Sequence, residues 1–207
     1  MSITTFSTLK TAVSNYLKGR NDIDDRIDEF IALGETRVNR KLRVPEMIST
    51  ATVVAAASVS LPADFLSMET AELQSDPTVP LSAIGRRAAQ KEYRDGTTGR
   101  PCSYRVQGGS TMLLFPTPDE STNITLEYYA KPAALVLTTQ ETNTIMPAHH
   151  DVLLYAAMCE AMLYIMDDAR VALWEGRLER AIEEANAAGS RTDRKGTKLQ
   201  PAYGSGS

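Results

Sequence analysis

The chain has few of the residues from which disulfide frameworks and zinc sites are built. Its 207 residues include two cysteines, Cys102 and Cys159, and two histidines. The cysteines lie far apart in the sequence and match no zinc or disulfide spacing, which indicates a reducing, cytosolic environment for folding. With 43% hydrophobic and 23% charged residues, the composition is ordinary for a globular protein, so a core can form without cross-links.

Motifs of nucleotide-binding and hydrolytic enzymes are also missing. The sequence contains no Gly-x-x-x-x-Gly-Lys-(Ser/Thr) loop to hold phosphate and no Gly-x-Ser-x-Gly turn to carry a nucleophilic serine. The pair Gly108-Gly109 lacks the spacing of a dinucleotide-binding loop. These absences favour a protein that acts through contacts with other molecules. We therefore expect no catalytic residue, no metal and no cofactor.

The two histidines, His149 and His150, are adjacent in the sequence. Metal ligation from a helix requires side chains three or four residues apart, whereas neighbouring side chains point about 100° apart. Glu160 lies about three turns farther along. A small metal-dependent enzyme built on His149, His150, Asp151 and Glu160 is therefore an alternative that the spacing disfavours. We interpret Pro147 and Asp151 as marks of a helix start.

An apolar run long enough to cross a membrane is absent too. The apolar run 152–166 is shorter than the ~20 residues that a bilayer requires, and Glu160 interrupts it. The N-terminus has no basic segment followed by an apolar run, so no signal peptide is expected. We expect 152–166 to be a helix buried on most sides, with Glu160 facing outward through a gap or paired with an arginine.

Charge is unevenly distributed along the chain. The formal net charge is −4, which argues against general duplex-DNA binding by the whole surface. The segment 189–207 has four basic residues against one acidic residue, a net charge of +3, so the remainder carries −7. Its charged residues are Arg191, Arg194, Lys195 and Lys198, with Asp193. An acidic body with a basic tail suggests that the two parts meet different surfaces.

Both ends of the chain have the periodicity of helices. Apolar residues recur at helical spacing over 5–18, with Gly19 as a C-cap, and over 22–42, where Asn21 or Asp22 can cap the helix and Pro45 ends it. Two longer helices are expected at about 148–166 and 168–188. The remaining segment, 189–207, has too few apolar residues to bury a core and is expected to be an extended tail.

The middle of the chain has short β-prone runs separated by proline and glycine. Gly108-Gly109 predicts a hairpin, and the alternation of Ile124, Leu126 and Tyr128 with polar residues predicts a half-buried strand. A short helix is expected over 82–94, with Ser82 as its cap. The expected strands are 52–54, 58–61, 67–73, 103–106, 112–115 and 124–129.

This layout predicts an α+β fold. We expect a helical bundle made from the N-terminal pair, 1–46, and the C-terminal pair, 146–188. A β-rich insert with a short helix occupies 47–145, and an extended tail occupies 189–207.

The order of these features resembles that of the head-to-tail adaptor, or connector, proteins of tailed bacteriophages. The resemblance spans nearly the whole chain and depends on the order and spacing of its motifs, each of which is weakly specific by itself. The stretches that carry it are the N-terminal helix pair ending in ETRVNRKLRVPEM, the strands of SVSLPADFLSMETAEL, the block from GRPCSYRV to LLFPTPDESTNITLEYYAKPAAL, and the helices of MPAHHDVLLYAAMCEAMLYIMDDARVALWEGRLERAIEE.

The resemblance implies a structural virion protein of the neck, assembled in the host cytoplasm. Such adaptors form a homo-oligomeric ring, a dodecamer matching the portal, that binds the portal on one side and a tail or nozzle protein on the other. They line a channel for double-stranded DNA without reading its sequence. No membrane and no cofactor are implied. A tail-tube or tail-completion protein is the alternative within the virion.

Two sets of residues are candidate contacts. In several relatives a C-terminal tail docks on the portal, and the matching residues here are Arg191, Arg194, Lys195, Lys198, Leu199 and Tyr203. A basic cluster in the insert is a candidate for contacts with a neighbouring subunit or partner, with a solvated helix face as the alternative. It consists of Arg86, Arg87, Lys91 and Arg94.

Overall fold

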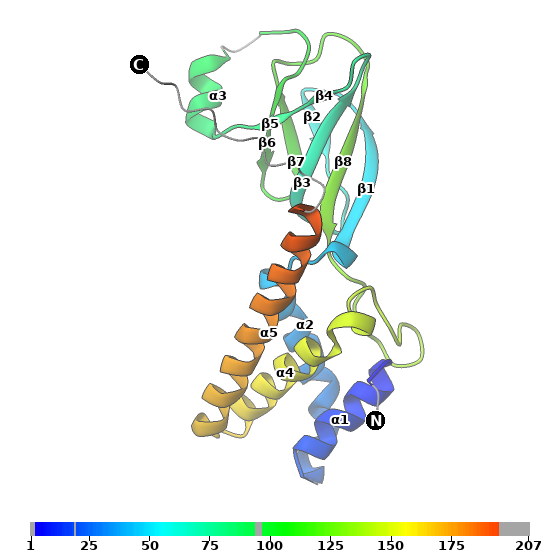
Figure 1. The fold of residues 1–207 in the computed structure, drawn as a ribbon, viewed down its shortest axis with the longest axis vertical. Coiled ribbons are helices and arrows are strands. Elements are labelled where there is room, and N and C mark those ends of the chain that lie inside the picture. Colours follow the sequence, from blue (N-terminus) through cyan, green and yellow to red (C-terminus); the bar gives the residue numbers. More distant parts are fainter. Residues whose placement is uncertain (1–2, 19, 94–96, 195–207) are drawn as a thin grey trace. The chain divides into compact units, whose positions relative to one another are not determined.

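The computed structural model describes residues 3–18, 20–93 and 97–194, with side chains at all of these except 21 and 191–194. They form two compact units. A helical unit takes the chain up to Glu46 and from Ala133 onward, and a β unit takes Met47–Pro132 (Figure 1). The predicted α+β fold is confirmed.

The helical unit contains four α-helices, as predicted, within the described residues. A 3-10 helix, η1, precedes α2, and a second, η2, follows it. Thr5 caps α1, because its side-chain oxygen accepts a hydrogen bond from the backbone N of Thr8 at 3.2 Å. The bounds are α1 Phe6–Tyr16, η1 Asn21–Arg26, α2 Ile27–Lys41, η2 Pro45–Met47, α4 Met146–Tyr164 and α5 Asp168–Arg194.

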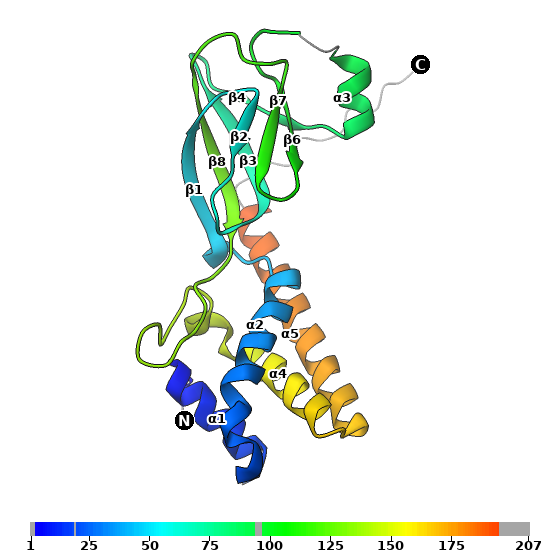
Figure 2. The same ribbon diagram turned by 180° about the vertical axis from the view of Figure 1, so that it is seen from behind.

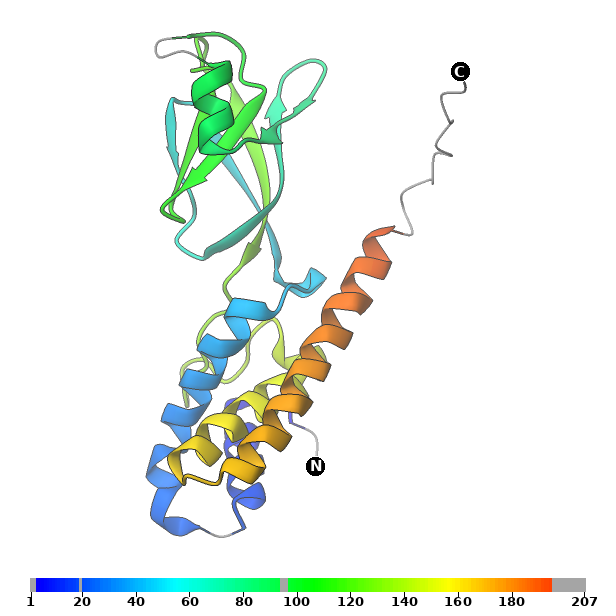
Figure 3. The same ribbon diagram turned by 90° about the vertical axis from the view of Figure 1, so that its left-hand side faces the viewer.

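Helix α4 is the centre of this unit and packs against α1, α2 and α5 (Figure 3). Its apolar side chains are buried on nearly all sides, as the apolar run 152–166 predicted. The approach of α2 is close because Gly34 faces the α4 backbone. A Cβ placed on Gly34 would lie 2.9 Å from the backbone N of Ala157 and 3.0 Å from the carbonyl carbon of Ala156.

The predicted start of the second helix differs from the structure. The second helix begins at Ile27, and no side chain caps it. Asp22 pairs with Arg20 at 2.7 Å and lies inside η1, so it does not cap α2. Gly19, the predicted C-cap of the first helix, lies outside the described residues.

The last helix does not end at 188 but continues to Arg194. The first part of the predicted tail is therefore helical. Gly189 packs closely on Pro45, since an added Cβ would lie 2.8 Å from the proline Cδ. The hydroxyl of Ser190 donates to the carbonyl of Asn186 at 3.1 Å, one turn earlier.

The segment 133–145, which we predicted as part of the insert, belongs to the helical unit. Glu35 of α2 accepts hydrogen bonds from the backbone N of Leu135 at 3.2 Å and from the side-chain amide of Asn143 at 3.3 Å. Leu135 and Ile145 are buried. The insert therefore ends at Pro132, because these buried residues and hydrogen bonds attach the segment to α2.

The β unit contains two four-stranded sheets around one apolar core (Figure 2). The strand orders are β1-β8-β3-β4 and β2-β7-β6-β5, and every pair is antiparallel except β5 with β6. A short helix, α3, follows β5. The bounds are β1 Ile48–Val54, β2 Ser58–Ser60, β3 Phe65–Gln74, β4 Val79–Pro80, β5 Ser82–Ala83, α3 Arg86–Glu92, β6 Ser103–Gln107, β7 Thr111–Phe115 and β8 Asn123–Ala130.

Two predictions about this unit are confirmed and one is wrong. Gly108 and Gly109 connect β6 to β7 in a hairpin, and both have positive φ, 63° and 73°, which glycine adopts without a steric penalty. In β8, Ile124, Leu126 and Tyr128 are buried as predicted, and the polar residues between them are partly or fully exposed. Ser82 does not cap a helix. It lies in β5, where its backbone N donates to the carbonyl of Cys102 at 3.0 Å, and α3 starts after Gly85.

Candidate assembly surfaces

Arg37 joins three helices of the helical unit through two carboxylates. Its Nε lies 3.1 Å from Oε1 of Glu160 on α4, and its Nη1 lies 3.1 Å from Oε1 of Glu175 on α5. The expectation that Glu160 pairs with an arginine is confirmed. Burial disfavours the charge of Arg37, but the hydrogen bond with Glu175 and the charge of Glu160 outweigh this effect, so the pKa of Arg37 is raised. The role of this cluster is structural.

The two cysteines differ in their surroundings. Cys159 is buried in α4, and burial raises the pKa of its thiol to about 11, so the reactive thiolate is disfavoured. Cys102 is exposed, and its Sγ lies 3.0 Å from the hydroxyl of Tyr93.

His149 and His150 stand where α4 is kinked. His149 has non-helical φ and ψ of −130° and 35°, and its Nε2 lies 3.5 Å from Oε2 of Glu46 without a hydrogen bond. Nδ1 of His150 is buried and has no hydrogen-bond partner among the residues that the structure describes. Over residues 3–18, 20–93 and 97–194, no three His, Cys, Asp or Glu side chains are grouped to hold a metal ion. The metal-enzyme alternative therefore gains no ligand set from these residues.

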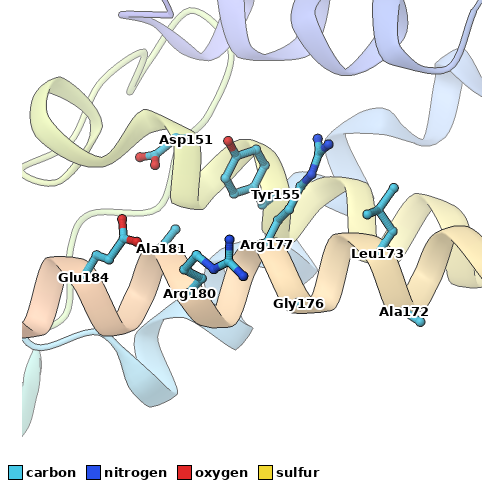
Figure 4. A pocket seen from close by; sticks show the side chains of 9 residues that line it. All are labelled: Asp151, Tyr155, Ala172, Leu173, Gly176, Arg177, Arg180, Ala181 and Glu184. Atoms are coloured by element: carbon cyan, nitrogen blue, oxygen red, sulfur yellow. The ribbon is translucent and has the colours of Figure 1, made fainter.

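A groove of about 510 Å³ runs along α5 beside the first half of α4. We call it the α4–α5 groove. This groove was not predicted from the sequence, although Gly176 and the exposed Leu173 interrupt the apolar pattern of this helix. An added Cβ on Gly176 meets nothing within 4 Å. The lining residues are Asp151 and Tyr155 from α4, and Ala172, Leu173, Gly176, Arg177, Arg180, Ala181 and Glu184 from α5 (Figure 4).

Two of the lining side chains, Arg177 and Tyr155, contact the ring of Trp174. The guanidinium carbon of Arg177 lies 4.9 Å from the centre of the Trp174 ring, and the Tyr155 and Tyr16 rings lie 5.8 and 5.4 Å from it. Such cation–π and edge contacts favour one arrangement of these side chains. The α4–α5 groove is therefore a preformed surface that carries acidic side chains, basic side chains and an exposed leucine.

A second groove, of about 460 Å³, lies in the β unit between α3 and the β6–β7 hairpin. We call it the α3 groove. Of the predicted basic cluster, Arg86 lines it, while Arg87 and Lys91 are exposed on α3. Arg94 lies outside the described residues. Arg105 of β6 also lines this groove and was missed, because no sequence signal relates it to a segment so far away.

The predicted portal-binding residues lie at or beyond the end of the described chain. Arg191 and Arg194 are in the last turns of α5, and their side chains are not described. Lys195, Lys198, Leu199 and Tyr203 lie outside the described residues, so their role stays a prediction. In the part of the chain that the structure covers, no helix is long and apolar enough to cross a bilayer.

Comparison with known proteins identifies the family. A search of curated proteins finds no match to the chain. A sequence model described as SU10 adaptor protein matches residues 4–201, and therefore covers both the helical unit and the β unit. This agrees with the resemblance found from the order of the sequence motifs. The chain belongs to the SU10 adaptor protein family, a family of phage head-to-tail adaptors.

Proposed function

We propose that the protein forms a homo-oligomeric ring, a dodecamer, which joins the portal to the next tail protein and surrounds the DNA channel. The family match over residues 4–201 carries this proposal, because it covers both units of the fold and the family is one of structural phage adaptors. Membership of the family also implies a place in the neck of the virion and interaction with portal and tail proteins.

Exposed apolar side chains on the helical unit support contacts between subunits. Met166, between α4 and α5, is 87% exposed and has a positive φ of 55°. A non-glycine residue rarely adopts this backbone region, and burial within its own chain does not reward the conformation. Contact with another protein would bury such side chains. The other large exposed apolar residues of this unit are Tyr16, Leu33, Val136, Leu137, Leu163, Tyr164 and Leu173.

Charge supports the two remaining parts of the proposal. The chain before residue 189 carries −7, and an acidic wall repels DNA phosphates, which favours sliding over binding. The basic residues from Arg191 onward suit an acidic surface on the portal. Each tail is short and its affinity modest, but many copies on one ring bind together with much greater strength.

Electron microscopy of the full chain mixed with its portal tests the ring. We expect a closed ring of the same symmetry as the portal, bound to one of its faces. A monomer that ignores the portal contradicts the proposal. A particle that binds only the tail tube or a tail-completion complex favours the tail-tube or tail-completion alternative.

Removal of the tail tests its role, and the structure decides where to cut. A cut at Gly189 would remove the contact with Pro45, so the chain should end after Arg194. We expect the shortened protein to unfold like the full chain and to attach weakly to the portal. Two full-length controls separate the causes: glutamine at Lys195 and Lys198 removes charge, and serine at Leu199 and Tyr203 removes the apolar anchors. Equal attachment by the shortened protein contradicts the tail's role.

Replacement of both His149 and His150 by alanine tests the enzyme alternative. We expect the variant to assemble and to support infection, because neither ring takes part in a described hydrogen bond. Loss of infectivity in correctly assembled particles would indicate chemistry at this position.

A further inference from the structure

Helix α3 packs on the β unit through few residues. Among the residues of α3 only Ala89 is buried. The Tyr93 ring, which follows the helix, stacks on Phe115 with centroids 5.9 Å apart and an interplanar angle of 24°. The space left open is the α3 groove. Its lining residues are Arg86, Ala89, Gln90, Tyr93, Arg105, Gln107, Leu113 and Phe115.

One edge of β6 is open beside this groove. Strand β5 pairs with β6 only at Ser103 and Tyr104, and the last contact is the bond from the backbone N of Ile84 to the carbonyl of Tyr104 at 2.8 Å. From Arg105 to Gln107 no described strand pairs with β6 on that side. Such an edge presents unpaired backbone groups, to which an extended peptide can add as a further strand.

The hydrogen bond from Ile84 to Tyr104 shows which way the backbone groups of Val106 point. Because alternate residues of a strand direct their N–H and C=O to the same side, Val106 points these groups the way Tyr104 does. Val106 therefore offers the open edge one donor and one acceptor. In the register with β7, Val106 lies opposite Met112 in a pair that exchanges no backbone hydrogen bonds. The N–H of Val106 is therefore not used inside the hairpin.

The groove is basic in an acidic protein. Arg86 and Arg105 line it and none of its lining residues is a carboxylate. Outside the lining, α3 adds the cations Arg87 and Lys91 and one carboxylate, Glu92, so the helix is basic overall. Within the described residues none of these four cations forms an ion pair. Gln107 accepts a hydrogen bond from Arg105 at 2.6 Å, which orients the guanidinium along β6.

These features favour a peptide over a nucleic acid. Single-stranded nucleic acid is held by stacking of its bases on free aromatic faces. Tyr93 and Phe115 stack on each other, so the faces between them are covered. A strand beside β6 would instead place alternate side chains near the arginines, with Leu113 and Phe115 as apolar contacts.

We propose that the α3 groove binds an extended acidic segment of a partner protein, which adds as a strand to the open edge of β6. Carboxylates of the segment pair with Arg86 and Arg105, and its backbone bonds to Val106. The site uses none of the C-terminal residues expected to dock on the portal, and the proposal does not depend on ring formation.

The test uses the full chain and fluorescein-labelled ten-residue peptides measured by anisotropy. The acidic probe alternates glutamate with valine, and its matched control has lysine for glutamate. We expect binding of the acidic probe alone. Each of Arg86→Glu and Arg105→Glu weakens it about tenfold or more, the effect of losing one charge-assisted contact. Arg87→Glu, a charge reversal on the same helix outside the groove, weakens it less.

Strand addition is tested first by changing the peptide and then by changing the protein. An acidic peptide with N-methyl groups on alternate residues cannot donate on one of its edges. We expect one phase of methylation to abolish binding and the opposite phase to preserve it. Val106→Pro removes the backbone donor on β6 and should abolish binding of the acidic peptide. Circular dichroism checks that the variant still folds.

Several outcomes overturn the proposal. These are equal binding of the acidic and lysine peptides, no binding of the acidic probe at millimolar concentration, and binding that neither methylation phase affects. The proposal also fails if the acidic peptide does not bind and the groove serves another partner. Loss of binding of a labelled oligothymidine in Arg86→Glu and Arg105→Glu would indicate a nucleic acid. Loss of self-association in these variants would indicate a second copy of the chain.

Discussion

The helical unit and the β unit bury their apolar residues in different ways. In the helical unit α4 is covered on nearly every side, by helices from both ends of the chain. In the β unit each strand contributes one face, as in β8, where Leu126 is buried and Glu127 is exposed. The first arrangement brings together segments more than a hundred residues apart, and the second comes from the continuous segment Met47–Pro132.

This difference teaches how each unit offers surfaces to partners. Helices that bury their own apolar stripes leave preformed grooves between them, such as the α4–α5 groove. A sheet always ends in an edge, and the edge of β6 beside the α3 groove stays open. The helical unit therefore offers side chains on fixed helices, whereas the β unit also offers backbone groups.

The strongest test of the comparison separates the two units. We expect residues 47–132 to fold when expressed alone, because their strands and core lie in one segment. Residues 1–46 alone should stay unfolded, since their apolar stripes are covered by α4 and short isolated helices are marginal in water. Circular dichroism and amide exchange measure both. An unfolded 47–132 fragment would show that its core depends on the rest of the chain.

The next largest effect is expected at the contact of α2 with α4. Gly34→Val should lower the free energy of unfolding by more than about 3 kcal/mol, because its side chain collides with the α4 backbone. Gly176→Ala is the matched control: it has open space and should stabilise by about 0.5–1 kcal/mol. Fluorescence of Trp174, the one tryptophan, reports unfolding of this unit. Equal effects would mean that the helices do not pack closely here.

Alkaline pH should weaken the helical unit through Cys159. Burial raises the pKa of its thiol from 9.0 to about 11, so the folded state keeps the proton that the unfolded state loses. The free energy of unfolding should fall as pH rises from about 9 to 11, by at most about 2.7 kcal/mol. Cys159→Ala removes this part of the decline, and the difference between the two denaturation series isolates it from other groups. Parallel series would contradict the assignment.

A smaller effect is expected from the charges between the helices. Glu160→Gln should cost about 1–2 kcal/mol, because it leaves the partly buried Arg37 with one carboxylate fewer. Glu179→Gln is the control, since its pair with Lys41 is well exposed and should contribute less than about 0.5 kcal/mol. Urea denaturation followed by Trp174 fluorescence compares them. A larger loss at Glu179 would reverse the ranking of these two ion pairs.

Much of the fold could be predicted from local patterns. The alternation in β8, the Gly108-Gly109 hairpin and the apolar run of α4 each depend on residues close in sequence. The wrong boundaries depend on distant partners. The segment before α4 is attached to the helical unit by Glu35, and the end of α5 packs on Pro45. No local pattern reports such contacts.

The same division holds for the candidate surfaces. The sequence by itself determined the α+β class, the acidic body with a basic tail, and the motif order that identified the family, because periodicity, charge and motif order are properties of the chain. Only the tertiary structure decided that Arg86 shares a groove with Arg105, and that the edge of β6 is open beside it. The physical reason is that a groove consists of side chains brought together by strand register and helix packing, both of which are set by contacts between residues distant in sequence.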